Sequence, residues 1–390
     1  MIRVGFVIER NTEQWTGGVS YYSNLFGALY GVSDRTIEPV VLIGSDTEVT
    51  RVVDRLPVEV IRASVLDQSG VMSLARRGIR RLLTHDRLLE ALLVKHRVAV
   101  LSHSGWLGMR STLPAIGWIP DLQHVHYPEF FSATEIAIRD RLFSAQCRLC
   151  DRVLVSSESA MKELSKRDPA CTTKARVLRF VARSPGDAPA AAGDGAAEGG
   201  NYFYLPNQFW VHKNHRLVIE AARLLKASGR HVRVLATGQT ADYRHPGLYE
   251  SLCDAIREAG LADSFILLGL VPRNDVGRLM RHAVAVINPS LYEGWSTTVE
   301  EAKSLGKRMI LSDIPVHREQ APADGVYFDP HKPAELADVL WRVWSEFDPV
   351  QDQRRMRRAL AEWPRRQAEF AREYVSLVRE VLESRRQGWK

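Results

Sequence analysis

The feature that most constrains the fold is a strand–loop–helix–strand unit at residues 284–312. It opens with the apolar run 284–290, which reads as a buried strand that Pro breaks into a loop. A helical pattern continues to residue 305, and Gly306 stops it before a second strand at 308–312. Such a unit joins two parallel strands, so a ligand is expected in the loop at their carboxyl edge.

Two carboxylates mark this loop. Glu293 lies in the loop, and Glu301 follows after seven intervening residues, inside the helix. Gly294 allows close backbone approach, and the hydroxyls and unpaired amides at the helix start could hold an anionic group. The residues that supply them are Ser296, Thr297 and Thr298. Spacing alone leaves open the alternative that Glu293 caps the helix and Glu301 is solvated.

Residues 288–308 resemble the signature of retaining glycosyltransferases of family 4, a Glu, seven residues, a second Glu, then Ala and a Gly before a strand. The resemblance implies an α/β GT-B fold, with two Rossmann-like, doubly wound domains facing a central cleft. It implies that Glu293 lies against the donor sugar and that Glu301 holds the ribose hydroxyls of the nucleotide. Trp295 stands in place of the usual Phe, and Ser296 replaces a frequent Gly.

The length of 390 residues suits two domains rather than one core. We expect an acceptor-side Rossmann-like domain at 1–184 and a Gly-, Ala- and Pro-rich linker at 185–201. A nucleotide-sugar-binding domain is expected at 202–365. The resemblance implies that a last helix, 366–390, packs back on the first domain.

In the first half, Gly17 and Gly18 follow a strand at 2–8 and start a helix. They do not form a G-x-G-x-x-G, so no dinucleotide fingerprint is supported. A plain tight turn would use the same glycines. The resemblance implies instead that this loop lies near the donor phosphates and the acceptor.

A polar stretch after the strand that ends near Trp118 is a candidate catalytic loop. Members of the family often carry a His–Asp pair here, with the His touching the transferred sugar. Pro120 stands at the His position, so only Asp121 is carried over. His124 or His126 is a candidate substitute, because histidine titrates near neutral pH, and we assign His126 together with Asp121 and Glu293 to catalysis. A structural role for each histidine is the alternative.

In the second half, Lys213 and Asn214 stand at a helix start, where a cation and free amides would meet a diphosphate. The family uses an Arg and a Lys at this turn. Lys213 matches the Lys, but Gln208 stands at the Arg position, so Arg273 or His212 is expected to compensate. The remaining donor-site candidate, in a loop after another strand, is Gly238.

The resemblance predicts a retaining hexosyltransferase that takes a sugar from a nucleoside-diphosphate donor to a glycan or lipid-linked glycan. No protein nucleophile and no cofactor are expected. The chain contains no Asp-x-Asp, which favours chemistry without a metal. Similarity to enzymes of bacterial surface-polysaccharide (O-antigen) assembly favours mannose from GDP-mannose, with UDP-hexoses and deoxyhexoses open. A sugar-nucleotide epimerase and a non-catalytic nucleotide-sugar-binding subunit are alternative functions.

Composition sets the remaining expectations. No apolar run approaches the roughly 20 residues of a membrane span, and no signal-peptide cleavage site is apparent, so a cytoplasmic protein is expected. The basic, apolar stretch 74–83 fits peripheral contact with the inner face of the plasma membrane, with a solvated helix face as the alternative. No nucleic-acid module accompanies the net charge of +7. Four cysteines argue against a disulfide scaffold, and Cys147 and Cys150 form an isolated C-x-x-C.

Overall fold

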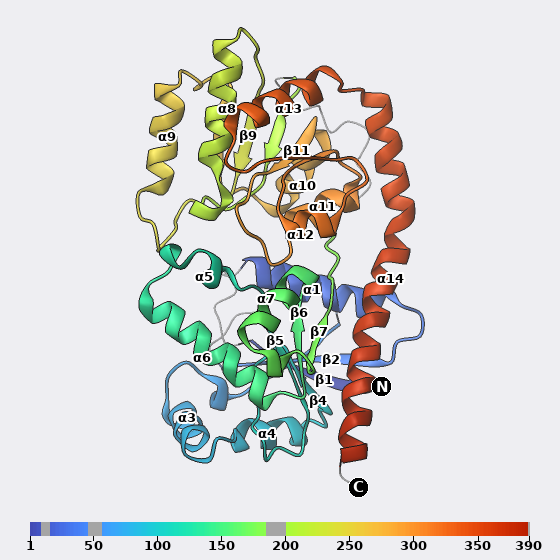
Figure 1. The fold of residues 1–390 in the computed structure, drawn as a ribbon. Helices are drawn as coiled ribbons and strands as arrows, with labels where there is room; N and C mark the ends of the chain where they lie inside the picture. Colours follow the sequence, from blue (N-terminus) through green and yellow to red (C-terminus); the bar gives the residue numbers. More distant parts are fainter. Residues whose placement is uncertain (9–15, 46–56, 185–199, 389–390) are drawn as a thin grey trace. The chain divides into compact units, whose positions relative to one another are not determined.

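The computed structural model describes residues 1–8, 16–45, 57–184 and 200–388 (Figure 1). The predicted linker 185–201 lies almost entirely outside the described residues. Contacts divide the chain into two compact units. Unit 1 consists of Met1–His126, Ala133–Val181 and Arg365–Lys390, and unit 2 consists of Tyr127–Ser132 and Ala182–Pro364. The short segment Tyr127–Ser132 therefore departs from the domain boundaries expected from the sequence.

Unit 1 is built on a parallel sheet whose described strands lie in the order β3-β2-β1-β4-β5-β6-β7. The strands are β1 (Ile2–Ile8), β2 (Ile37–Ile43), β3 (Glu59–Arg62), β4 (Val100–Ser102), β5 (Ala115–Trp118), β6 (Arg152–Val155) and β7 (Ala175–Val177). Continuous apolar runs such as that of β1 suit strands that are covered on both faces. The strand that the sequence predicts at 2–8 is confirmed as β1.

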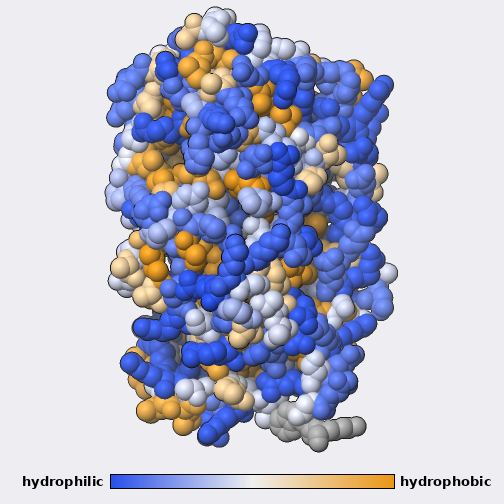
Figure 2. Space-filling model, in the orientation of Figure 1, coloured by the Kyte–Doolittle hydropathy of each residue, from blue (hydrophilic) through white to orange (hydrophobic). Residues whose placement is uncertain are grey.

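The helices of unit 1 alternate with its strands. They are α1 (Thr16–Gly31), α3 (Val71–Leu83), α4 (Arg87–Lys95), α5 (Gln123–His126), α6 (Ala133–Leu149) and α7 (Glu158–Arg167). Most of the visible surface is hydrophilic, but apolar side chains gather at the lower left of Figure 2, where Figure 1 draws α3. This gathering is unusual because a surface helix normally turns its apolar side toward the core.

Unit 2 contains a second parallel sheet, whose described strands lie in the order β10-β9-β8-β11-β12-β13. The strands are β8 (Phe203–Leu205), β9 (Val234–Thr237), β10 (Phe265–Gly269), β11 (Ala285–Asn288), β12 (Met309–Ser312) and β13 (Gly325–Phe328). The helices are α8 (His215–Ala227), α9 (Leu248–Glu258), α10 (Arg273–His282), α11 (Thr297–Leu305), α12 (Pro315–Gln320), α13 (Pro333–Ser345) and the first part of α14 (Pro349–Gly388).

The predicted strand–loop–helix–strand unit is confirmed as β11, α11 and β12. β11 and β12 are parallel neighbours, with Val286 opposite Met309. Gly306 adopts a left-handed conformation with φ 67°, which glycine tolerates without steric cost, and it ends α11. A short apolar run broken by Pro, a helical pattern and a glycine were therefore sufficient to locate this unit.

Both sheets have the strand order of a Rossmann fold, so the predicted pair of Rossmann-like domains is confirmed. In each unit the chain starts at a central strand, builds outward to one side, and then crosses to the other side. The reversal falls between β1 and β4 in unit 1 and between β8 and β11 in unit 2. Ligands of open parallel sheets bind beyond the carboxyl ends of the strands at such a switch point.

The second half of α14 belongs to unit 1. Leu377, Val378 and Val381 are buried there. The hydroxyl of Tyr374 donates to Ser102 Oγ over 2.8 Å, and Glu380 forms ion pairs with arginines on β6 and β7. Apolar burial and buried polar contacts together fix this part of α14 on the unit. Within the described residues, no helix is both long and apolar enough to cross a bilayer.

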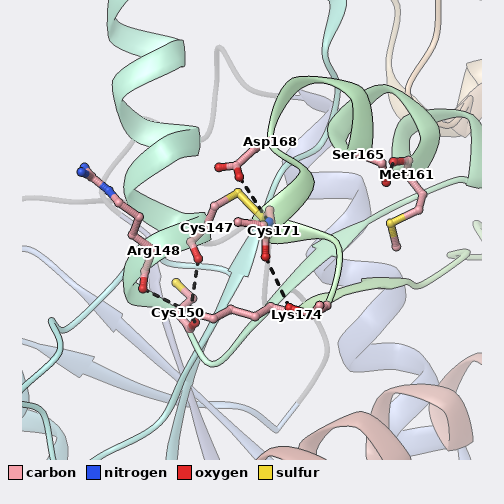
Figure 3. The surroundings of a disulfide bond; sticks show 10 residues. Cys147, Arg148, Cys150, Met161, Ser165, Asp168, Cys171 and Lys174 are labelled. Carbon is pink, nitrogen blue, oxygen red and sulfur yellow. Dashed lines mark hydrogen bonds between the residues drawn. A yellow bond between two sulfur atoms is a disulfide. The ribbon is translucent and has the colours of Figure 1, made fainter.

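The cysteines differ from expectation. Cys147, on α6, forms a disulfide with Cys171, 24 residues later, rather than acting with Cys150 (Figure 3). The short helical turn Pro169–Cys171 packs against α6, which brings the two sulfur atoms together. Cys150 is buried, and burial raises the pKa of its thiol to about 12. That thiol is a poor metal ligand at neutral pH, and the C-x-x-C spacing has no chemical role here.

A buried ion pair joins the start of β12 to α14 within unit 2. Lys307 Nζ lies 2.5 Å from Asp352 Oδ2, and the Lys307 side chain is fully buried. Asp352→Ala should lower the free energy of unfolding by about 3 kcal/mol, because it leaves a buried ammonium without its partner. Urea denaturation followed by circular dichroism would measure the loss.

The matched control is Asp338→Ala, which removes an exposed carboxylate from α13 and should change stability by less than about 0.5 kcal/mol. Equal effects of the two substitutions would show that the Lys307–Asp352 pair does not stabilise the unit.

Candidate functional site

The carboxyl edge of the unit 2 sheet carries the candidate site. At its switch point, Asn207 follows β8 and Asn288 ends β11, and both are buried. Asn207 Nδ2 donates to Asn288 Oδ1 over 3.2 Å. This contact holds the two strand ends together where the chain reverses direction, so the loops that follow have fixed starting points.

A network of polar side chains extends from Asn288 into the next loop. Asn288 Nδ2 donates to Ser296 Oγ over 2.8 Å. Ser290 Oγ lies 2.7 Å from both Asn288 Oδ1 and Glu293 Oε1, and its single proton can serve one of them at a time. Buried networks of this kind restrict side-chain rotamers. The Glu293 carboxylate is consequently held at the loop tip by the strand end itself.

Glu293 forms an ion pair with a lysine in the turn between β8 and α8. Lys213 Nζ lies 2.6 Å from Glu293 Oε1, and the two side chains are 14% and 9% exposed. Burial alone would raise the pKa of Glu293, but the Lys213 ammonium outweighs burial and lowers that pKa to about 2. Glu293 is therefore a carboxylate throughout the physiological pH range.

Glu301 has the opposite electrostatic state. It is 8% exposed, and burial raises the pKa of its carboxyl to about 7. Arg273, at the start of α10, lies 3.6 Å from it but is half exposed, and only partly offsets the burial. Two carboxyl groups in one strand–helix unit thus carry different charges at pH 6, which separates their chemical roles.

The contacts at the helix start differ from the alternative that the sequence had left open, in which Glu293 caps the helix and Glu301 is solvated. Ser296, not Glu293, caps α11, since its Oγ accepts a hydrogen bond from Val299 N. Glu301 is buried rather than solvated. Thr298 Oγ1 lies 3.2 Å from Asn207 Oδ1, so the first turn of α11 is tied to the end of β8.

The other predicted residues of this loop lie between the two carboxylates. Gly294 is buried, and Trp295 is half-buried. Thr297 is the first residue of α11. The loop therefore places its backbone and its helix start beside Glu293, in the arrangement expected from the sequence.

The turn after β8 has two further predicted residues. Asn214 adopts a left-handed conformation with φ 56°, and its side-chain amide donates to Pro289 O and Pro330 O. Its amide therefore holds the turn to neighbouring loops. Gln208, at the position of the missing arginine, accepts a hydrogen bond from Gln239 N over 2.5 Å.

Gly238 follows β9 at the same edge. A Cβ atom there would lie 2.3 Å from the carbonyl oxygen of Asn207, so only glycine fits against the end of β8. The close approach brings the β9 loop directly beside the switch point.

Neither of the two residues considered as a replacement for the missing arginine stands free beside Lys213. Arg273 lies against Glu301. His212 is buried, and burial, aided by the neighbouring Lys213 charge, lowers its pKa well below the usual value, so the ring is neutral. On the turn after β8, Lys213 is the cationic side chain that lies against Glu293.

Sequence reasoning missed His317, on α12. It is buried, and burial lowers its pKa to about 4, although the Glu293 charge acts in the opposite direction. Its Nδ1 lies 3.0 Å from Ser312 O, and its Nε2 is buried with no hydrogen-bond partner among the described residues. The neutral ring therefore presents a lone pair at Nε2. A strand-to-helix turn after β12 was the signal that could have identified it.

In unit 1, the predicted catalytic loop is a short helix, α5, rather than an open loop. Asp121 Oδ1 accepts from Gln123 N and pairs with Arg139 over 2.9 Å. His124 is buried against Asp140, and burial lowers the pKa of its ring. His126 is half exposed and lies 3.0 Å from Glu163. All three side chains have partners within unit 1, and of the two histidines His126 is the more accessible.

The switch point of unit 1 holds residues that the sequence analysis did not select. Gly17 and Gly18 form the first turn of α1, as predicted. His103 follows β4 in a left-handed conformation with φ 61°, which a non-glycine residue seldom adopts. Its Nε2 lies 2.7 Å from Tyr21 Oη on α1, and its Nδ1 lies 2.7 Å from Ser102 Oγ. Burial lowers the pKa of His103 to about 3, so the neutral ring links α1 to β4 through hydrogen bonds.

Residues 191–362 match the family model described as "Glycosyl transferases group 1". The chain thus contains a domain of this kind, which covers nearly all of unit 2. The O-antigen chain mannosyltransferase RfbU of Salmonella typhimurium is 29% identical over 130 residues, which are 33% of this chain and 35% of that protein. The matched part therefore spans about a third of the length of that relative.

Solved structures resemble the whole chain. Anabaena HepE in complex with UDP and glucose has a TM-score of 0.69 and 16% identity, with 97% of this chain and 99% of that one covered. The sucrose-phosphate synthase of Thermosynechococcus elongatus has a TM-score of 0.65 and 15% identity, with 97% and 100% covered. At this identity the likeness establishes the fold, which is the GT-B fold of glycosyltransferases.

The raised pKa of Glu301 predicts that its ionised carboxylate lowers the free energy of unfolding at neutral and higher pH. Below pH 4.5 the carboxyl is protonated in both the folded and the unfolded chain, whereas above pH 7 the fold must bury a carboxylate. Glu301→Gln should therefore stabilise the ligand-free protein at pH 8, by up to about 3 kcal/mol, and the gain should shrink toward pH 5. Thermal unfolding of both proteins across this pH range measures the effect.

Glu362→Gln, at an exposed position of α14, is the matched control and should show no such pH dependence. A Glu301→Gln protein that is equally destabilised at both pH values would mean that the Glu301 carboxylate supports the fold.

Proposed function

We propose that this protein is a retaining glycosyltransferase that moves a hexose from a nucleoside-diphosphate sugar to a glycan or lipid-linked glycan. The observation that carries the proposal is the pair of largely buried carboxyl groups at the carboxyl edge of unit 2, with Glu293 paired to Lys213 and Glu301 near Arg273. The match of residues 191–362 to a glycosyltransferase family supports it.

The donor would lie across the carboxyl edge of the unit 2 sheet. Glu301 would accept hydrogen bonds from the ribose hydroxyls, since burial opposes the charge of its carboxyl and hydroxyl donors would stabilise its ionised form. Lys213 uses one of its three N–H donors on Glu293, and the others remain for a phosphate oxygen. Glu293 would accept from hydroxyls of the transferred sugar.

The reaction would need no protein nucleophile. Departure of the nucleoside diphosphate builds negative charge on the leaving phosphate, which Lys213 and the amides at the start of α11 would stabilise. The acceptor hydroxyl would attack the face that the leaving group vacates and pass its proton to the leaving phosphate oxygen. The pKa of Glu293, about 2, fits a residue that positions the sugar rather than one that transfers a proton.

The resemblance of part of the chain to an O-antigen mannosyltransferase supports mannose from GDP-mannose as the transferred sugar. UDP-hexoses are the competing donors, because the similar HepE structure contains UDP and glucose. We propose metal-independent transfer in the cytoplasm, with His126 or Asp121 of unit 1 contacting the sugar or the acceptor.

Two other functions use the same donor site. An epimerase would convert the nucleotide sugar without an acceptor, and a binding subunit would hold it without turnover. Both retain nucleotide binding, so turnover with acceptor and slow donor hydrolysis discriminate between the three functions.

Glu293→Gln and Lys213→Met should separate binding from catalysis. We expect each to lower donor hydrolysis at least about a hundredfold, since each removes a charged group beside the reacting carbon or the leaving phosphate. Lys213→Met should also reduce nucleotide-dependent stabilisation, measured by thermal shift with GDP, UDP, dTDP and their sugars. All assays are run with and without EDTA.

Glu362→Gln is the control and should behave as wild type. Unchanged turnover in Glu293→Gln would contradict the assignment, and loss of turnover with EDTA would contradict metal independence. Stabilisation by a nucleotide sugar without any turnover would favour the binding subunit.

A further inference from the structure

Helix α3 (Val71–Leu83) turns polar side chains inward and apolar side chains outward, the opposite of most surface helices. Its buried residues are Ser73 and Arg76, both polar. Val71 is 82% exposed, Leu74 60% and Leu82 85%. Figure 2 shows an apolar area at the lower left, where Figure 1 draws α3. A soluble helix normally buries its apolar side, so this side needs another apolar environment.

Buried polar contacts fix this orientation. Arg76 Nε lies 2.8 Å from Asp86 Oδ2, and these side chains are 9% and 1% exposed. Arg80 lies 4.0 Å from the same carboxylate, with its guanidinium over the ring of Trp106. Rotation of α3 to bury its leucines would break this pair and leave the buried Asp86 carboxylate without a cation, which is strongly unfavourable. The outward apolar side is therefore a stable feature of unit 1.

The exposed apolar residues form a continuous stripe. Val71, Leu74 and Leu82 have the i, i+3, i+11 spacing that places them within an arc of about 100° on a helix. Ala75 and Gly78, both exposed, fall in the same arc and add no polar group. The stripe is the apolar half of an amphipathic helix, turned to the outside.

The loop after β4 lies against the residues that follow α3 and exposes a further apolar side chain. Asp86 N donates to Leu107 O over 2.7 Å, which holds this loop against the end of α3. Two residues further on, Met109 is 79% exposed and Arg110 is exposed. An exposed methionine followed by an arginine repeats the composition of the helix.

The charge around the stripe has one sign. Residues 71–83 contain four arginines and no Asp or Glu. Arg77 and Arg81 are exposed and flank the stripe, while Arg76 and Arg80 neutralise Asp86. A second copy of the chain would bring the same arginines together and repel. An apolar stripe flanked by guanidinium groups complements a surface with negative phosphates above an apolar layer.

We propose that α3 and the loop tip at Met109 dock unit 1 on an anionic lipid bilayer. The apolar stripe inserts at the boundary between headgroups and acyl chains, and Arg77, Arg81 and Arg110 contact lipid phosphates. This inference goes beyond the proposed function and does not depend on it, because it rests on unit 1 alone. It is compatible with an acceptor that is anchored in lipid.

The test is co-sedimentation of the full-length protein with vesicles of phosphatidylcholine, with or without phosphatidylglycerol. Wild type should bind the anionic vesicles, bind neutral ones much less, and dissociate at high salt. Leu74→Ser/Leu82→Ser should weaken binding at least about tenfold by removing the apolar contribution, and Arg77→Gln/Arg81→Gln should weaken it and reduce its salt dependence.

The matched control is Val350→Ser/Leu360→Ser, which removes two comparably exposed apolar residues from α14 and should leave vesicle binding unchanged. All four altered residues of the two α3 variants are exposed, so thermal unfolding should match wild type. Donor hydrolysis without vesicles should be unchanged in the α3 variants, which separates this test from that of the proposed function.

Two results would overturn the proposal. One is wild-type protein that stays in solution with anionic vesicles, or binding that the leucine variant retains in full. The other is a vesicle-free dimer that the leucine variant converts to a monomer, since the occupant of the stripe would then be a second copy.

Discussion

The parallel sheet is the constraint on which the rest of the structure depends. Parallel strands require a crossover after each strand, so every strand-to-helix loop of a unit lies at one edge. In unit 2 this edge collects Lys213, Gly238, Arg273 and Glu293 from four different loops, although they are spread over 80 residues. The reversal between β8 and β11 opens that edge at one place, and the buried Asn207–Asn288 contact fixes its width. Site geometry is therefore a consequence of strand order.

The electrostatic surroundings of Glu293 and Glu301 shift their pKa values in opposite directions. Both are largely buried, and burial opposes the charge of each. Lys213 reverses this effect for Glu293, whereas the half-exposed Arg273 does not do so for Glu301. Glu293 is consequently satisfied before any ligand binds, while Glu301 is a costly group that hydroxyl donors can stabilise. A bound ligand with hydroxyls at Glu301 would offset the free energy that burial of this carboxylate costs the ligand-free protein.

The sequence predicted local features well and tertiary partners poorly. The unit from β11 to β12 could be located because a Pro after the apolar run and a Gly after the helical pattern mark its boundaries in the sequence. The turn after β12 marks the position of His317 in the sequence, but its importance, like that of His103, comes from where β12 and β4 end in their sheets. The Cys147–Cys171 bond was missed for the same reason, because the C-x-x-C spacing draws attention to Cys150 and nothing in the sequence shows that Cys171 packs beside α6. Asp121 and His124 found partners on α6 that spacing could not indicate.

Helix α3 shows both the reach and the limit of pattern analysis. Its mixture of leucines and arginines identified an amphipathic segment, but periodicity does not determine which side faces the core. That choice follows from Asp86, which caps α4 through Leu89 N and also accepts Arg76. The buried Asp86 carboxylate requires a cation. Arg76 supplies it, and so the polar side of α3 faces inward. The apolar side must then face outward, so the exposed stripe is the price of a well-satisfied buried charge, and a lipid surface is the environment in which that arrangement costs least.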